Sequence, residues 1–322
     1  MPISDKMLSF AAALRATLPA LIPTSERLRS VLPDPARPGR VLRATDALEH
    51  SPALDPVIRP LRRAVHAVPM GGARDVLHGR WLGHPLHPVL VQLPIGSWLS
   101  AAVLDLVPGP GNRRAAGLLV GTGLAGALPA AVTGWTDWAE MRPAQARVGL
   151  VHALANSAAV GLYGASLSCR LRGHRMRGRA YGYAGLTAVM AGGLLGGHLA
   201  YRQSASVNHA ESVPAISDGA WHLVGEVGEF AVGEPARRMI GEVPVLVVRG
   251  GGGEVHVLAD RCSHMAGPLS EGTLIDGCVQ CPWHGSVFRL SDGWNISGPA
   301  TSPQPVYDTR LIDGRIEARL RP

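Results

Sequence analysis

Four apolar stretches, each close to 20 residues long, limit the folds open to this chain more than any other feature of its sequence. They cover residues 89–107, 115–132, 148–167 and 181–200. A helix that crosses the hydrocarbon core of a bilayer needs about 20 apolar residues. One such stretch also suits the buried helix of a soluble protein, but four in succession do not. The sequence therefore predicts a bundle of four transmembrane helices.

The glycines of these stretches recur at a spacing that suits close packing of helices. Three pairs of glycines are four residues apart: Gly117 with Gly121, Gly192 with Gly196, and Gly193 with Gly197. Small residues at this spacing let two helix backbones approach each other in a membrane. We therefore expect the bundle to be compact.

The distribution of charge argues against a nucleic-acid partner. Only 17% of the residues are charged, against roughly 25% in a soluble globular protein. The net charge of +7 divides into +5 for residues 1–80, +6 for residues 81–216 and −4 for residues 217–322. The basic excess thus lies in a proline-rich N-terminal part and in loops between apolar stretches, while the folded polar region is acidic. We expect membrane lipid, and no nucleic acid, as a partner.

Changes in composition divide the chain into four parts. Residues 1–79 contain ten prolines and scattered arginines, which predicts a poorly ordered tail. Residues 80–203 hold the four-helix transmembrane domain, and residues 204–216 form a polar linker. Residues 217–322 alternate short apolar runs with glycine-rich turns, a pattern typical of a small all-β domain. The expected fold class is an all-α transmembrane four-helix bundle followed by a small all-β domain.

Two cysteines and two histidines stand in the β region at a metal-ligand spacing. Cys262 and His264 are followed by Cys281 and His284, in the pattern C-x-H-x16-C-x2-H. Such a set can hold a tetrahedral zinc ion, although zinc fingers usually pair Cys with Cys and His with His. One Cys and one His on each of two loops suit a [2Fe-2S] cluster, in which one iron binds both thiolates and the other both imidazoles.

With these residues in place, residues 217–322 resemble a Rieske domain of the bacterial ferredoxin type. Further matching positions are Gly267-Pro268-Leu269, Gly285-Ser286-x-Phe288 and Gly298-Pro299. The resemblance implies that Cys262 and Cys281 bind the inner iron, that His264 and His284 bind the outer iron, and that electrons leave through the histidine edge. Such centres have a higher reduction potential than all-cysteine clusters.

The chain also departs from parts of that family. Respiratory Rieske domains carry a disulfide between two further cysteines, whose positions here are Gly267 and Trp283, and Cys278 fills neither position. The departure favours the ferredoxin branch and a lower potential. Ser286 is a candidate hydrogen-bond donor to cluster sulfur or a simple turn residue, and Trp283 is expected to shield the cluster from water. Since the sequence stops at Pro322, we expect no complete Rieske oxygenase.

The helical part resembles an uncharacterised bacterial family of four-helix membrane domains over about residues 80–203, beginning with the stretch 81–88. If the helices alternate in direction, one membrane face carries His87, Asp137, His152 and His198. Clustered ionisable groups in a membrane are candidates for function. They suggest a haem b or quinone site, with Asp137 as a supporting partner, or a hydrogen-bonded cluster that braces the helices.

Three functions are compatible with these features. The first is a membrane-tethered Rieske electron-transfer protein that passes single electrons between a reductase or membrane carrier and a partner. The second is a membrane oxidoreductase whose bundle binds haem or quinone and exchanges electrons with the cluster. The third is a redox-sensing or assembly module. The first two make the chain an electron carrier or an oxidoreductase subunit, with a redox donor and an acceptor protein or quinone as partners.

The expected location is the cell membrane, with several spans. The arginines between residues 170 and 179 would place that loop in the cytoplasm by the positive-inside rule. This orientation would export the iron-sulfur domain, although no export signal for a folded domain is present. We therefore expect a cytoplasmic Rieske domain.

Overall fold

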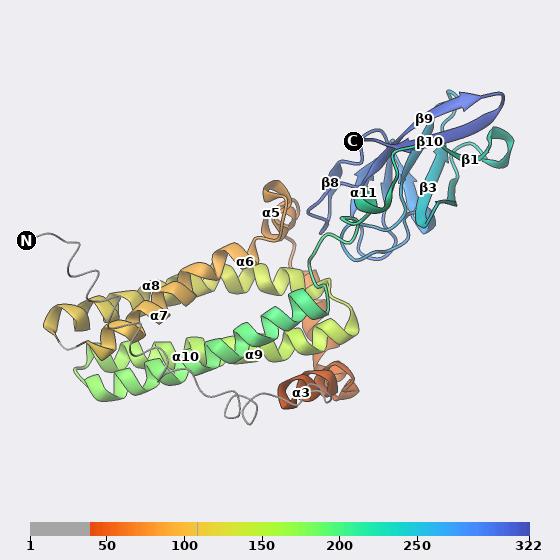
Figure 1. The fold of residues 1–322 in the computed structure, drawn as a ribbon. Coiled ribbons are helices and arrows are strands. Elements are labelled where there is room, and N and C mark those ends of the chain that lie inside the picture. The colour runs from red at the N-terminus through yellow and green to blue at the C-terminus, as the bar shows by residue number, and fades with distance from the viewer. Residues whose placement is uncertain (1–38, 108) are drawn as a thin grey trace, which may run out of the picture. The chain divides into compact units, whose positions relative to one another are not determined.

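The computed structural model describes residues 39–107 and 109–322 (Figure 1). The chain divides into two compact units, Met1–Ser51 and Pro52–Pro322. In the first unit the described part is helix α3 (Arg40–Glu49), whose Thr45 hydroxyl donates to the Leu42 carbonyl at 2.9 Å. Most of the tail expected over residues 1–79 lies outside the described residues or, from Pro52 on, forms helices.

The second unit begins with helices where the proline content predicts a poorly ordered tail. Helix α4 (Asp55–Ala67) follows the short η1 (Pro52–Leu54), and α5 (Ala73–His78) comes next. Pro56 stands in the first turn of α4, where a backbone N–H has no helical partner to lose. Ile58 is buried against Trp138 and Leu150, so tertiary packing stabilises α4 against its unfavourable composition.

The apolar stretches form long helices, as the sequence predicts. The helices of the bundle are α6 (His87–Leu90), α7 (Gln92–Leu106), α8 (Pro110–Ala139), α9 (Pro143–Leu171) and α10 (Arg175–Gly197). Proline is the first residue of both α8 and α9, where its fixed φ favours helix initiation. Helix α10 continues into the π-helix η3 (His198–Arg202).

Three of the described helical segments are long and apolar enough to cross a membrane: His87–Leu106, Pro110–Ala139 and Pro143–Leu171. The fourth expected span corresponds to α10, which is 23 residues long but is rich in glycine and also contains two tyrosines. A helical bundle followed by a β domain is thus confirmed, while the fourth span stays a prediction.

Glycines do bring the helices close together, but mostly not the paired ones. Gly123 lies against the indole of Trp98, where an added Cβ would be 2.2 Å from the ring nitrogen. Gly185 lies in the same way against Tyr163, and the rings of Trp98 and Tyr163 stack with centroids 4.2 Å apart. Of the predicted pairs, Gly192 with Gly196 lies against α9, since an added Cβ would be 2.7 Å from the Asn156 side chain and 3.2 Å from the His152 ring, respectively. A Cβ at Gly117 would meet nothing within 4 Å.

The β domain contains two antiparallel sheets, in the orders β1-β10-β9-β4-β3-β2 and β5-β6-β7-β8. The strands are β1 (His222–Glu226), β2 (Pro235–Ile240), β3 (Val243–Arg249), β4 (Val255–Ala259), β5 (Thr273–Ile275), β6 (Cys278–Gln280), β7 (Val287–Arg289), β8 (Asn295–Ser297), β9 (Val306–Ile312) and β10 (Arg315–Leu320). The remaining short helices are η2 (Arg80–Leu82), α11 (Val213–Ile216), η4 (Val227–Glu229) and η5 (Leu269–Glu271).

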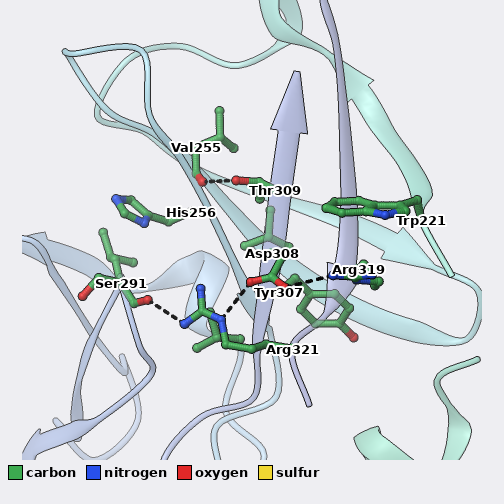
Figure 2. Close-up of a pocket in the computed structure, with 12 residues that line it drawn as sticks. Trp221, Val255, His256, Ser291, Tyr307, Asp308, Thr309, Arg319 and Arg321 are labelled. Carbon is green, nitrogen blue, oxygen red and sulfur yellow. Dashed lines mark hydrogen bonds and ion pairs between the residues drawn. The ribbon is translucent and has the colours of Figure 1, made fainter. Parts of the chain in front are cut away.

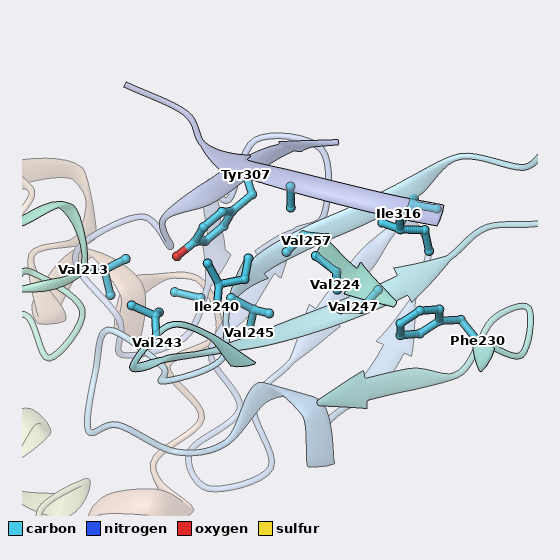
Figure 3. Packing of buried hydrophobic residues seen from close by; sticks show 13 residues of the cluster. Val213, Val224, Phe230, Ile240, Val243, Val245, Val247, Val257, Tyr307 and Ile316 are labelled. Atoms are coloured by element: carbon cyan, nitrogen blue, oxygen red, sulfur yellow. The ribbon is translucent and has the colours of Figure 1, made fainter. Parts of the chain in front are cut away.

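Strand β3 is buried on both faces and joins two hydrophobic clusters. Its Val245 and Val247 point into one cluster with Phe230 and Tyr307, which Figure 3 shows. Leu246, on the opposite face, packs in a second cluster that includes the thiols described below. Because side chains alternate across a strand, one central strand supports both the sheet core and the candidate metal centre.

Candidate metal centre

Two tight loops carry the four Cys and His residues of the motif. The first loop follows β4 and is closed by a hydrogen bond from the Cys262 N–H to the Gly267 carbonyl at 2.8 Å. The second joins β6 to β7, and the Cys281 N–H donates to the Ser286 carbonyl at 2.8 Å. Backbone hydrogen bonds therefore fix both cysteines, whose side chains are almost completely buried.

The histidines lie together at the other side of the two loops. The imidazole rings of His264 and His284 have centroids 5.0 Å apart and are perpendicular to each other. Nδ1 of His264 is buried and has no hydrogen-bond partner among the described residues. A buried polar atom without a partner is costly, so this nitrogen is available to bind a metal.

The pKa values of His264, His284 and Cys281, but not that of Cys262, favour the metal-binding forms of these side chains. Burial lowers the pKa of His264 to about 3 and that of His284 to about 4, so both imidazoles are neutral at pH 7. A hydrogen bond between the thiols raises the pKa of Cys262 and lowers that of Cys281 to about 7. A neutral imidazole and a thiolate are the forms that ligate metals.

The four side chains are arranged as two pairs. Among the described residues, no three His, Cys, Asp or Glu side chains form a group that would hold a single metal ion. Cys262 instead contacts Cys281, and His264 contacts His284. A zinc ion needs four donors around one point, whereas a Rieske cluster binds two thiolates at one iron and two imidazoles at the other. The pairing therefore fits the cluster better than zinc.

Gly267 and Trp283 lie against each other across the two loops. A Cβ at Gly267 would be 3.0 Å from both the Cys281 sulfur and the Trp283 ring, so there is no room for a longer side chain. Trp283 thus covers the cysteine side of the first loop, although 51% of its surface stays exposed. All four cysteines of the chain are free thiols.

Ser286 connects the second loop to the segment around Pro299. Its side chain is fully buried, and its Oγ accepts a hydrogen bond from the Ala300 N–H at 3.1 Å. Gly298, with φ of +89°, packs so closely that an added Cβ would be 2.7 Å from the Ser286 Cα. Because Oγ acts as an acceptor here, its own proton is free to be donated elsewhere.

Gln304 supports the first loop, and the motif does not reveal it. Its Nε2 donates to the carbonyls of Ala259 and Arg261 at 2.7 and 2.6 Å, and its Oε1 accepts from the Ser263 N–H at 3.0 Å. The residue lies about 40 positions after the loop, in a stretch without any metal-ligand pattern. A buried glutamine that satisfies three backbone groups is visible only once the fold is known.

The membrane histidines are only partly brought together. The rings of His87 and His152 have centroids 6.2 Å apart, and their Nδ1 atoms lie 2.8 Å from the carbonyl oxygens of Ala130 and Gly192. His198 lies in the π-helix after α10. Asp137, the expected supporting partner of this site, has its carboxylate hydrogen-bonded to Nδ1 of His78 at 2.8 Å.

A pocket of about 520 Å³ lies on the β domain between Trp221, His256 and Arg321 (Figure 2). Arg321 is paired with Asp308 at 2.9 Å, and the Thr309 hydroxyl donates to the Val255 carbonyl at 2.9 Å. None of the motif residues lines this pocket. We therefore assign it no chemistry.

Comparisons with known proteins identify both parts of the chain. Residues 220–308 match the model of the Rieske [2Fe-2S] domain, and residues 83–209 match that of a predicted membrane protein family, DUF2231. The anthranilate 1,2-dioxygenase ferredoxin subunit of Burkholderia cepacia is 40% identical over 100 residues, which cover 31% of this chain and 92% of that protein.

Two further relatives match the same region. The 3-phenylpropionate/cinnamic acid dioxygenase ferredoxin subunit of Escherichia coli (strain K12) is 37% identical over 91 residues, 28% of this chain and 84% of its own length. A ferredoxin-oxygenase complex of carbazole 1,9a-dioxygenase is 28% identical with a TM-score of 0.30, over 32% of this chain and 94% of the matched chain. The chain therefore belongs to the Rieske [2Fe-2S] family, as a ferredoxin-type electron-transfer domain that follows a DUF2231 domain.

Proposed function

We propose that the chain is a membrane-tethered Rieske ferredoxin, which passes single electrons between a reductase or membrane carrier and a partner. The observation that carries this proposal is the pairing of thiol with thiol and imidazole with imidazole on two rigid loops. When bound, a Rieske cluster supplies one-electron chemistry at a potential above that of all-cysteine clusters. The relatives are ferredoxin subunits of dioxygenases, so an oxygenase or its reductase is the class of partner that we propose.

The role of each residue follows from its position in the two loops. Cys262 and Cys281 would hold one iron as thiolates, and His264 and His284 would hold the other. For His264 the ligating atom would be Nδ1, because this nitrogen is buried and has no partner in the part of the chain that the structure describes. Trp283 keeps water from the cysteine side, and the free hydroxyl proton of Ser286 is placed to donate to a cluster sulfur.

The membrane is the second part of the proposal. The helices leave many large apolar side chains exposed: Leu99, Val103, Leu118, Leu128, Leu154 and Met190. A patch of this extent is unfavourable in water and suits contact with lipid. Tethering raises the effective concentration of the electron carrier near partners in the same membrane.

The decisive experiment is spectroscopy of the full chain, purified anaerobically in detergent after native expression. We expect about two iron atoms and two acid-labile sulfides per chain, with a reduced-state EPR signal shifted from that of an all-cysteine cluster by imidazole ligation. Stoichiometric zinc without iron would overturn the proposal.

We expect four spans, with the C-terminal domain in the cytoplasm. Reporter fusions after Arg172 and at Pro322 should then report opposite sides of the membrane, with Pro322 inside. The alternative of three spans, without α10, would place both reporters on the same side. A periplasmic signal at Pro322 would reverse the orientation.

A second candidate function is an oxidoreductase whose bundle binds haem or quinone. It is favoured by His87 and His152, whose rings have centroids 6.2 Å apart and whose Nδ1 atoms lie against backbone carbonyls. The Asn156 side-chain amide lies 3.3 Å from Nε2 of His152, so this amide would have to move before that nitrogen bound a ligand. The sequence leaves open whether His198 or His87 pairs with His152, and the short distance between the rings favours His87. A haem would give a Soret band that a Rieske cluster lacks.

For this second candidate, we expect His152→Ala to slow oxidation of the reduced cluster by membrane acceptors while its EPR signal is unchanged. His174→Ala, in the turn between α9 and α10, is the matched control, since it changes a histidine that lies outside both helices. Normal transfer in a stable His87→Ala, His152→Ala double variant would leave the Rieske domain as the only redox site.

A further inference from the structure

Helix α5 and the segment after it contact the β domain beside the candidate metal centre. The Gly298 N–H donates to the Asp75 carboxylate at 3.1 Å, and Arg80 donates to the Asn295 carbonyl at 3.1 Å. The His209 N–H, in the linker, donates to the Ser263 carbonyl at 2.9 Å. Figure 1 shows α5 next to β8. These contacts reach both the first cluster loop and the segment that packs on Ser286.

His78, the last residue of α5, is an almost fully buried histidine with one free nitrogen. Only 2% of its surface is exposed. Its Nδ1 lies 2.8 Å from the Asp137 carboxylate at the end of α8, whereas its Nε2 is buried and has no hydrogen-bond partner within residues 39–107 and 109–322. The carboxylate fixes the tautomer with the proton on Nδ1, so Nε2 is a hydrogen-bond acceptor.

His78 lines a small cavity that is also lined by residues of the candidate metal centre. His78 and Asp137 line it from the helical part, and Ser263, His264 and Pro299 line it from the β domain. The cavity has room for about one water molecule. An acceptor made electron-rich by a carboxylate therefore faces the ring of a proposed cluster ligand.

We infer that His78 and Asp137 are positioning residues for the cluster ligand His264. One water molecule would bridge the two rings: it accepts a hydrogen bond from Nε2 of His264 and donates one to Nε2 of His78. The inference rests on the proposed function, and it assigns the contact to the chain's own helical domain.

The expected effect on the cluster has a definite sign. A hydrogen bond from the His264 ring to an acceptor backed by Asp137 increases the electron density that the imidazole gives to its iron. This stabilises the oxidised cluster, which carries the greater positive charge, more than the reduced one. Removing the acceptor should therefore raise the reduction potential.

The test is a redox titration of the full chain in detergent, in which the EPR signal of the reduced cluster is measured at each potential. His78→Ala should increase the ratio of reduced to oxidised cluster about tenfold at a fixed ambient potential, a shift of about 59 mV for one electron. Asp137→Asn should shift it less in the same direction, because His78 stays in place. His84→Ala is the control, since its ring lies exposed against its neighbour's carbonyl, and should change nothing.

Two results would overturn the inference. The first is a potential of His78→Ala and Asp137→Asn equal to that of the wild type, with the cluster present at full stoichiometry. The second is an equal shift in His84→Ala, which would indicate a general disturbance. Failure of the proposed function is distinguishable, because it appears earlier, as absence of the cluster EPR signal from the wild-type protein. If His78→Ala does not fold, Asp137→Asn alone decides the question.

Discussion

Replacing Cys262 by serine should abolish the iron-sulfur centre completely. Cys262 is 1% exposed, and its side chain contacts Cys281 within the hydrophobic cluster between the two loops. A serine hydroxyl is a poor ligand for iron in a thiolate position, and three remaining ligands do not hold both irons. Iron and acid-labile sulfide should fall from about two each per chain to near zero, together with the EPR signal.

Cys278→Ser is the matched control for this prediction. Cys278 lies only three residues before Cys281, at the start of β6, but its thiol donates to the Asp276 carbonyl at 3.8 Å. The cluster content of Cys278→Ser should equal that of the wild type. If Cys262→Ser keeps its iron while Cys278→Ser loses it, the assignment of ligands is wrong.

The sequence predicts most of the fold because its strongest signals are local. The length and apolar composition of each stretch are enough to predict a helix. The first two helical segments begin at His87-Pro88 and at Pro110, and proline favours the first turn of a helix. The prediction of a poorly ordered tail is wrong at α4, and the reason lies in long-range packing. The sequence around Pro56 and Pro60 is unfavourable for a helix, and contacts with residues some 80 or more positions later stabilise it: Ile58 packs against Trp138, and Asp55 pairs with Arg147 at 2.8 Å.

The sequence motif predicts the four ligands of the metal centre, but it does not predict the residues that support them through long-range contacts. The four Cys and His residues are close in sequence, so spacing alone brings them together. Gln304 and His78 have no such spacing, since their partners lie about 40 and 60 residues away. The contact of Asp137 with His78 is not predicted, because helix faces do not reveal that α5 places His78 beside this carboxylate.

Replacing Arg170 by methionine should destabilise the bundle by about 3–5 kcal/mol, because it leaves Asp105 buried without a partner. Arg170 Nη1 donates to the Asp105 carboxylate at 2.9 Å, with a second, parallel contact from Nη2. The side chains are only 11% and 5% exposed. Arg170 Nε also donates to the Ser166 hydroxyl at 3.1 Å, so the guanidinium is held in one orientation.

The measurement is the free energy of unfolding in mixed micelles, followed by helical circular dichroism. Arg172→Met, two residues later and exposed, is the control and should change this free energy by no more than about 0.5 kcal/mol. A double variant, Asp105→Leu with Arg170→Met, should recover most of the loss, because no charge is then left buried. Equal destabilisation by Arg170→Met and Arg172→Met would show that the ion pair does not hold α7 against α9. Since Arg170 lies at the end of the bundle away from His78, the cluster signal of folded Arg170→Met should equal that of the wild type.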